Sequence, residues 1–229
     1  MDTLEVIEAG TRPSLDEAFE AGLREFLTRH GIDAPVRVDE PALTRVVIVR
    51  DEQGTLLGGG RVHQRHAKHG FPAQWTLRHF VEQREHVRAR TNDAVEIAGL
   101  WATTSAQRSG IARLIAQGCL ASAKAMGKTT AFTIGHTRFE QVLRAVGLAP
   151  VLGLGEVPYP TPSYAARLYN AELAKLPGAT RHDRDVITTI VENLALGPAP
   201  MPLHELASIE HGCPSWTVKR KSTKLRAAC

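Results

Sequence analysis

The sequence predicts an α/β fold in which one mixed central sheet, of the α+β type, is flanked by helices. Short β-branched runs alternate with amphipathic helical patterns along most of the chain. Two predicted strands follow each other as a hairpin, and the last two strands also lack a helix between them, so the order is not a regular βαβ repeat. Of the 229 residues, 43% are hydrophobic and only 5% aromatic, which predicts a sizeable, mainly aliphatic core.

The first third of the chain predicts a strand, a helix and a hairpin. The helix should begin at a capping box, Ser14-Leu-Asp-Glu17, and end at His30-Gly31. The turn of the hairpin lies at residues 51–54, and the unbroken apolar run over residues 46–49 indicates a strand covered on both faces. The expected strands span residues 4–9, 43–50 and 56–63.

The middle of the chain contains a polar, histidine-rich insertion over residues 64–92. Apolar residues at helical spacing predict one amphipathic helix within it, with Leu77, Phe80, Val81 and Val87 on one face. The later strands are expected over residues 93–103, 130–134, 150–156 and 163–170, and the later helices over residues 111–126 and 138–146.

The C-terminal part predicts a helical extension. Asp183 or Asp185 should cap its helix, and a basic tail follows over residues 219–226. We therefore divide the chain into a domain over residues 1–170 and an extension over residues 171–229. A solvated terminus is the favoured interpretation of the tail, and contact with nucleic acid or an acidic carrier protein is the alternative.

Composition restricts the class of protein. The net charge of +4 suits an anionic ligand or partner but is too small to require nucleic acid, so we expect no nucleic-acid binding. Cys119, Cys213 and Cys229 are far apart and form no CxxC pair, which favours a reducing cytoplasm. The first residues do not have the pattern of a secretory signal, and no apolar run is long enough to cross a membrane.

The turn over residues 107–112, Gln-Arg-Ser-Gly-Ile-Ala, follows a strand and opens a helix. Unpaired N–H groups and the helix dipole make such a place suitable for a phosphate or pyrophosphate. Gly110 lets the backbone approach a ligand closely, and Arg108 can add a charged contact. An ordinary strand–turn–helix junction, in which the glycine only relieves the turn, is the alternative.

This turn resembles motif A of the GNAT superfamily of N-acyltransferases, whose pattern is Gln/Arg-x-x-Gly-x-Gly/Ala between a strand and a helix. The order of elements over residues 4–170 is also similar to the order in that superfamily. The resemblance implies that the loop amides hold the pyrophosphate of a coenzyme A thioester and that the preceding strand lines the pantetheine arm. The cofactor-binding residues implied in this way are Leu100, Trp101, Ala102, Gln107, Arg108, Ser109, Gly110, Ile111 and Ala112.

Glu96 is the candidate general base. It lies on the strand before the turn, among the apolar residues Val95, Ile97 and Leu100. A carboxylate in such dry surroundings should have a raised pKa, which brings it toward the strength that a general base needs. In GNAT enzymes a Glu at about this place often deprotonates the amine. A Glu on the solvent face, paired with an Arg, is the alternative.

The general acid of the reaction is unassigned. GNAT enzymes often carry a Tyr four residues before the Gly that ends the last helix, and this position, counted from Gly147, holds Leu143. His136 lies near the place where many members carry Asn beside the cofactor. It is our second catalytic candidate, either contacting the cofactor or protonating the leaving thiolate, and a loop histidine without such a role is the alternative.

Other segments are similar to one branch of the superfamily, the autoinducer synthases and long-chain N-acyl amino acid synthases. These segments are the glycine run before Arg61, the insertion, and the stretch that ends at Tyr164. The Arg that follows the Glu in homoserine lactone synthases is absent, since residues 98–100 are Ala-Gly-Leu. Arg61 and Tyr164 are our substrate-binding candidates. For Arg61, a surface ion pair is the favoured interpretation over a substrate carboxylate.

The histidines at 63, 66 and 69 have a spacing that could suggest a metal. No Cys or Glu accompanies them, so we expect a solvated polar loop and no metal site.

These observations predict a cytoplasmic GNAT-type N-acyltransferase. An acyl thioester of coenzyme A or of acyl carrier protein would be the donor, and a small-molecule amine would attack it directly. The protein could also form a homodimer. The alternative is a non-catalytic GNAT-like module that binds a ligand or partner.

Overall fold

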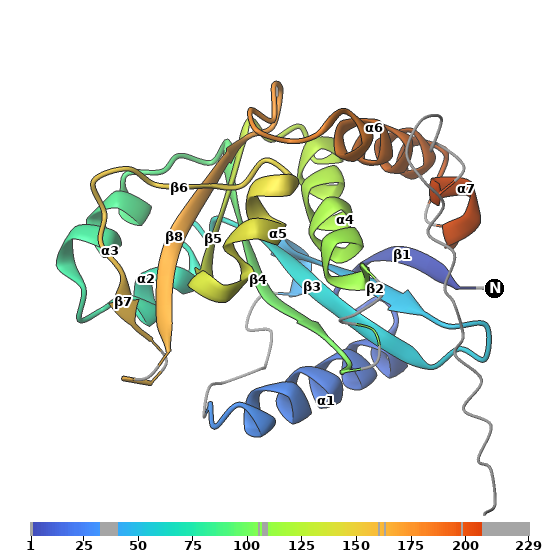
Figure 1. Ribbon diagram of the computed structural model, residues 1–229, viewed down its shortest axis with the longest axis horizontal. Coiled ribbons are helices and arrows are strands. Elements are labelled where there is room, and N and C mark those ends of the chain that lie inside the picture. The colour runs from blue at the N-terminus through green and yellow to red at the C-terminus, as the bar shows by residue number, and fades with distance from the viewer. Residues whose placement is uncertain are drawn as a thin grey trace, which may run out of the picture.

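The computed structural model describes residues 2–32, 41–104, 106, 110–159, 161–162, 164–197 and 199–207. Its centre is a mixed sheet with the strand order β6-β8-β5-β4-β3-β2-β1-β9, to which β7 adds by pairing with β8 (Figure 1). The strands are β1 (Thr3–Glu8), β2 (Thr44–Arg50), β3 (Leu56–Gln64), β4 (Ala94–Ala102), β5 (Thr130–His136), β6 (Ala149–Pro150), β7 (Val157–Pro158), β8 (Ala165–Glu172) and β9 (Met201–Pro202). The α-helices are α1 (Pro13–Arg29), α2 (Pro72–Thr76), α3 (Val81–Arg88), α4 (Ile111–Ala125), α5 (Glu140–Ala145), α6 (Arg181–Leu196) and α7 (Leu203–Ala207).

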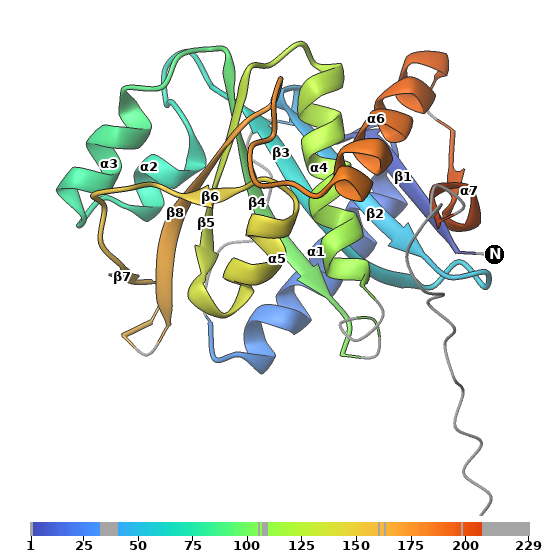
Figure 2. The same cartoon turned by 45° about the horizontal axis from the view of Figure 1, so that its top comes forward.

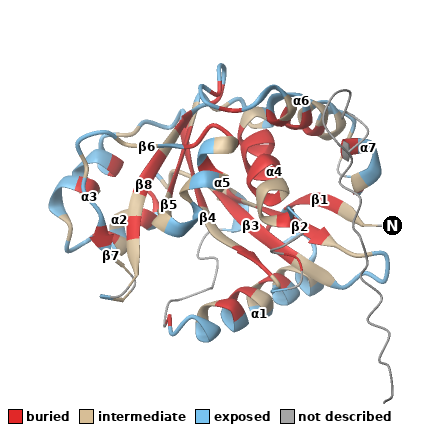
Figure 3. Cartoon of the chain, in the orientation of Figure 1, coloured by how far each residue is buried: buried red, intermediate tan, exposed pale blue. Residues whose placement is uncertain are grey.

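Helices cover both faces of the sheet, and each face has its own apolar core. The helix α4 packs on one face against Val47, Val62 and Ile97, and α1 packs on the other face against Val46 and Ile48. All residues of β2 from 46 to 49 are buried, which confirms the predicted strand with two covered faces (Figure 3). The core is mainly aliphatic, as the composition predicts.

The glycines of β3 allow both helices to approach the sheet closely. A Cβ atom on Gly59 would lie 2.7 Å from the ring of Phe19 in α1, and one on Gly60 would lie 2.9 Å from the sulfur of Cys119 in α4. These distances are shorter than side chains tolerate, so residues without side chains are needed at this crossing.

The strands β4 and β5 run parallel but pair over only three positions, from Ala94↔Thr130 to Glu96↔Phe132. Beyond Glu96 they diverge, and Figure 2 shows the gap opening toward the N-terminal end of α4. The other edge of β4 carries a bulge, because three steps on β4 match two on β3 between Ala98 and Trp101. Gly99 lies in this bulge with a φ of +59°, a conformation that other residues adopt at a cost.

The insertion differs from its prediction. It forms two short helices, α2 and α3, rather than one, and it isn't a purely polar segment. Phe71, Leu77 and Val87 are buried there, and the ring of Phe71 meets that of Phe132 edge to face at 5.0 Å. The sequence pattern missed the break because Phe80 begins α3 as its N-cap residue instead of continuing a longer helix.

Two predicted helix starts are also wrong. The N-cap residue of α1 is Arg12, and Ser14 lies inside the helix because Pro13 occupies its first turn, where a missing N–H costs nothing. The helix α6 is capped by Thr180, whose hydroxyl accepts a hydrogen bond from the N–H of Asp183. Residues 150–156 form no long strand, since only the short β6 and β7 flank this loop.

The extension after residue 170 packs on the rest of the chain. Its helix α6 buries Val186, Ile187 and Ile190 in the same core as α4, and β9 pairs with β1. None of the described helices has the length and apolar character that a membrane span requires. The predicted basic tail over residues 219–226 lies outside the described residues.

Candidate active site

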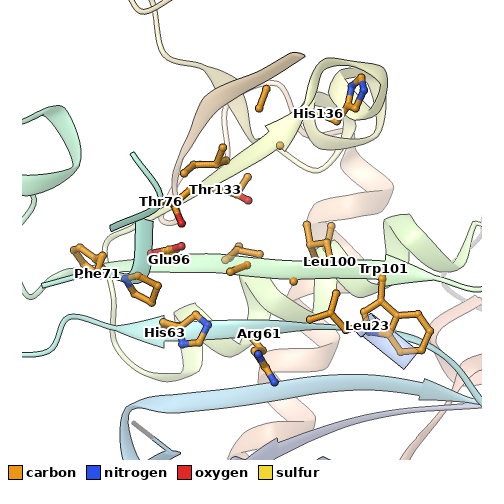
Figure 4. Close-up of a pocket in the computed structure, with 18 of the residues that line it drawn as sticks. Leu23, Arg61, His63, Phe71, Thr76, Glu96, Leu100, Trp101, Thr133 and His136 are labelled. Carbon is orange, nitrogen blue, oxygen red and sulfur yellow. The ribbon is translucent and has the colours of Figure 1, made fainter. Parts of the chain in front are cut away.

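A cavity of about 780 Å³ occupies the gap between β4 and β5. Residues 96–102 of β4 form one wall and residues 133–136 of β5 form another, while α1, α2, α4 and α5 close the remaining sides. Figure 4 shows His63, Thr76, Glu96 and Thr133 near one end of this cavity, Leu100 and Trp101 further along β4, and His136 across from them at the end of β5. The cavity is therefore a direct consequence of the short β4–β5 pairing.

Glu96 lies where the two strands separate, and its side chain lines the cavity. The residue is only 5% exposed, so the alternative of a solvent-facing Glu is wrong. Its Oε2 atom accepts a hydrogen bond of 2.8 Å from the N–H of Ala73 in α2. Burial raises the pKa of Glu96 to about 8, although the Ala73 hydrogen bond acts in the opposite direction. The carboxyl group is thus poised to exchange a proton near neutral pH.

Glu96 belongs to a row of polar residues that crosses three neighbouring strands. Thr44 of β2 is the register partner of His63 in β3, and His63 is the register partner of Glu96. All three line the cavity, and the hydroxyl of Thr44 lies 3.0 Å from Nδ1 of His63. Burial, with a smaller effect of the Arg61 charge, lowers the pKa of His63 to about 3, so its ring is neutral.

Sequence reasoning missed the role of His63 and Thr44 in this wall. Grouping His63 with His66 and His69 in a solvated loop is wrong for His63, which lies on a strand next to the cavity. The strand predicted over residues 56–63 ends at His63, and this is the signal that could have found it. The expected solvated loop fits His66 and His69 only in part, because His69 is exposed and His66 half-buried but both line the cavity, with their rings stacked at 4.7 Å. Among the described residues, no group of three His, Cys, Asp or Glu side chains could hold a metal ion.

Arg61 lies on the same face of β3 as His63 and also lines the cavity. It is 5% exposed and pairs with Glu20 of α1 at 3.1 Å, while its guanidinium lies 4.8 Å from the ring centroid of Phe19. The expected ion pair of Arg61 is therefore present, but it forms in the wall of the cavity instead of on the surface. This position places the charge of Arg61 beside His63, where it contributes to the lowered pKa of the imidazole.

The predicted cofactor residues of β4 extend along the cavity from the bulge. Leu100, Trp101 and Ala102 all line it, and the Trp101 ring packs near Phe19 with 6.1 Å between centroids. Past Glu96 no described strand pairs with the β5-facing edge of β4. Because N–H groups alternate between the two edges of a strand, main-chain donors are left facing the gap.

The helix α4 begins beside this wall. Gly110 is its N-cap residue, with a φ of +80° and an exposed backbone, and Ile111 is the first helical residue. Ala112 lines the cavity, so the start of the helix borders it. The predicted pyrophosphate-binding residues Gln107, Arg108 and Ser109 lie outside the described residues.

His136 and Tyr164 meet at the β5 side of the cavity. Their rings are 4.1 Å apart and packed edge to face. Nδ1 of His136 accepts a hydrogen bond from the N–H of Arg138, so a neutral ring carries its proton on Nε2. Burial, followed by the charge of Arg138, lowers the pKa of His136, which favours this neutral form. Leu143, at the position of the absent Tyr, is a buried apolar part of the cavity wall.

No protein-family model and no curated protein matches the sequence. Solved structures do match the fold. FeeM, an N-acyl amino acid synthase from uncultured soil microbes, has a TM-score of 0.58 at 10% identity, over 81% of this chain and 99% of that one. MesI, a CoA-dependent acyl-homoserine lactone synthase, has a TM-score of 0.58 at 14% identity, over 82% and 95%. BjaI, another such synthase solved with SAM and isopentyl-CoA, has a TM-score of 0.56 at 15% identity, over 91% and 99%.

The chain has a GNAT-like fold. This confirms the fold class that the element order and the turn over residues 107–112 predict. The similarity to the synthase branch, expected from the insertion and from the segment that ends at Tyr164, is also present in the folds of the matched structures.

Proposed function

We propose that the protein is an N-acyltransferase that moves an acyl group from a thioester to an amine. The observation that carries this proposal is the buried carboxyl group of Glu96, which faces a cavity at the point where β4 and β5 separate. Two of the matched structures, MesI and BjaI, are CoA-dependent synthases and FeeM is an N-acyl amino acid synthase, which supports a thioester donor. Coenzyme A and acyl carrier protein are the two candidate carriers.

The donor would lie along β4 with its phosphates at the start of α4. The exposed backbone at Gly110 and the helix dipole suit a pyrophosphate, and Ala112 borders the cavity that would receive the pantetheine arm. Main-chain N–H groups facing the gap past Glu96 would bind the thioester carbonyl oxygen and stabilise the charge that forms on it. Gln107, Arg108 and Ser109 are proposed to complete the pyrophosphate site.

In the chemical step, the amine nitrogen attacks the thioester carbonyl carbon. A carbon–nitrogen bond forms, and the carbon–sulfur bond then breaks. Glu96 takes a proton from the nitrogen, and the leaving thiolate receives one proton. His136, which lines the cavity on the β5 side, is our candidate donor in its imidazolium form, because the lowered pKa of the ring makes that form a ready acid, and solvent protonates the ring again afterwards. Arg61 and Tyr164 are proposed to bind the acceptor, together with the cavity wall around Glu96.

The test combines donor binding with turnover. Calorimetry with acyl-coenzyme A and acylated carrier protein measures donor affinity, and a thiol-release assay over a panel of amines measures transfer. We expect binding of at least one donor and amine-dependent thiol release. Binding of neither donor would contradict the proposal, whereas donor binding without release for any amine would favour the non-catalytic module, to which the Leu at position 143 gives some support.

A further inference from the structure

We propose that His63, held by Thr44, is the second group that binds the acceptor amine, so that its attacking nitrogen is held between His63 and Glu96. This inference rests on the proposed function. It gives a role to His63, a half-buried polar side chain in the cavity wall that takes no part in the proposed chemistry.

The register of the sheet puts the two groups close together. His63 and Glu96 are directly opposite on antiparallel strands, where Cβ atoms are about 5 Å apart, and both side chains line the same cavity (Figure 4). Hydrogen bonds hold each of them from the outer side, since Thr44 contacts Nδ1 of His63 and the Ala73 N–H contacts Oε2 of Glu96. Among the described residues, Nε2 of His63 and Oε1 of Glu96 have no protein partner, which leaves two polar atoms for a ligand.

The charges around His63 suit a hydrogen-bonding role rather than a role as base. Among the described residues, the charged groups on this wall are Arg61 on the same strand, Glu96 on β4, and Glu20 of α1, which pairs with Arg61, and the titratable His66 and His69 also line the cavity. Arg61 and the dry surroundings keep the His63 imidazole neutral. A neutral imidazole orients the amine by a hydrogen bond, while the amine proton goes to Glu96, so His63 is unchanged by the reaction.

The test uses three variants of the full chain. His63→Leu removes the ring nitrogens but keeps an apolar side chain, Thr44→Val removes only the hydroxyl that fixes the ring, and His63→Gln restores one hydrogen-bonding group. The exposed His79, which lies in the insertion and outside the cavity lining, provides the control His79→Gln. For each variant we would measure the donor Kd, the acceptor KM, kcat against pH, and the melting temperature.

We expect His63→Leu to raise the acceptor KM about ten-fold with an unchanged donor Kd. Thr44→Val should act in the same direction but less, His63→Gln should recover part of the loss, and the control should match the wild type. The rise of kcat with pH should persist in His63→Leu, because Glu96 remains the base.

Two results would overturn the inference. One is a wild-type acceptor KM in both His63→Leu and Thr44→Val when both are folded. The other is loss of the pH-dependent rise in His63→Leu, which would make His63 the base. Absence of any turnover in the wild type would instead contradict the proposed function itself, and the two failures are therefore distinguishable.

Discussion

At the scale of single residues, the site depends on what burial does to Glu96. An isolated carboxylate in the dry wall of the cavity is unfavourable, and within the described part of the chain a single hydrogen bond reaches it, from Ala73. Its proton is therefore retained to a pKa of about 8, which is close to the value that a base working at neutral pH needs. The raised pKa must also make the free energy of unfolding depend on pH, because Glu96 holds its proton more tightly in the folded than in the unfolded chain.

The first prediction concerns that linkage. Glu96 has a higher pKa in the folded than in the unfolded chain, so wild-type stability should fall as pH rises from about 4.5 to about 8. The slope from this group is at most about 1.4 kcal/mol per pH unit. Glu96→Gln should remove this slope, so that chemical denaturation shows the stability of the variant rising relative to that of the wild type as pH rises. The exposed Glu82 offers the control Glu82→Gln, and parallel pH curves for wild type and Glu96→Gln would contradict the raised pKa.

The burial and the pKa direction of a side chain could be predicted from the sequence where the neighbouring residues determine them. The apolar neighbours of Glu96 predict its burial, and burial is what raises its pKa. The partners of the functional side chains could not be predicted in this way. Ala73 reaches Glu96 from an insertion 23 residues earlier, and the pairing of Arg61 with Glu20 spans 41 residues. Such contacts depend on strand register and helix docking, which a pattern of residue types does not specify.

At the scale of elements, β4 combines two irregularities on its two edges. Its pairing with β5 ends at Glu96, and its pairing with β3 is interrupted by the bulge at Gly99. The end of the β4–β5 pairing opens the cavity. The bulge at Gly99 turns Leu100 and Trp101 relative to the residues before them. Element types and their order were predictable from apolar periodicity, but such breaks in pairing were not, because they leave no periodic signal.

The second prediction tests the bulge with two glycines of similar conformation. Gly99→Ala should cost about 1–2 kcal/mol of stability, because its φ of +59° strains an alanine and the new Cβ would lie 3.1 Å from Leu23. Gly153 has a φ of +82° in an exposed loop with open space around it, so Gly153→Ala should cost a similar amount. Only Gly99→Ala should also weaken donor binding in calorimetry. Equal donor affinity in both variants would mean that the bulge does not shape the donor site.

At the scale of the whole molecule, the extension is attached to the core through a polar cluster between α4 and α6. Asp183 is fully buried and accepts hydrogen bonds from Nε of Arg113 at 2.7 Å and from Gln117 at 2.8 Å, and it also contacts the Thr180 hydroxyl. Burial alone would raise the pKa of Asp183, but these hydrogen bonds outweigh it and hold the pKa below its ordinary value. The sequence predicted a cap at Asp183, whereas its side chain joins two helices.

The third prediction is that Asp183→Asn destabilises the chain by about 2–3 kcal/mol at pH 7, because Arg113 loses its charged partner while remaining partly exposed. The loss should shrink below pH 4, since a group with a lowered pKa contributes stability that disappears on protonation. Asp185→Asn, two residues further along the same helix and exposed, is the control and should change stability by less than about 0.5 kcal/mol. Denaturant unfolding measures the change in stability of both variants. Equal losses in Asp183→Asn and Asp185→Asn would contradict the stabilising role of the Asp183 hydrogen bonds between α4 and α6.

The central claim is that Glu96 is the base of an acyl transfer. The most direct measurement is amine-dependent thiol release by Glu96→Gln at saturating donor, compared with the wild type and with Glu82→Gln. We predict a loss of turnover of about 10²–10⁴-fold in Glu96→Gln, with an unchanged donor Kd and a folded variant, and no loss in Glu82→Gln. Wild-type turnover in Glu96→Gln would contradict the claim.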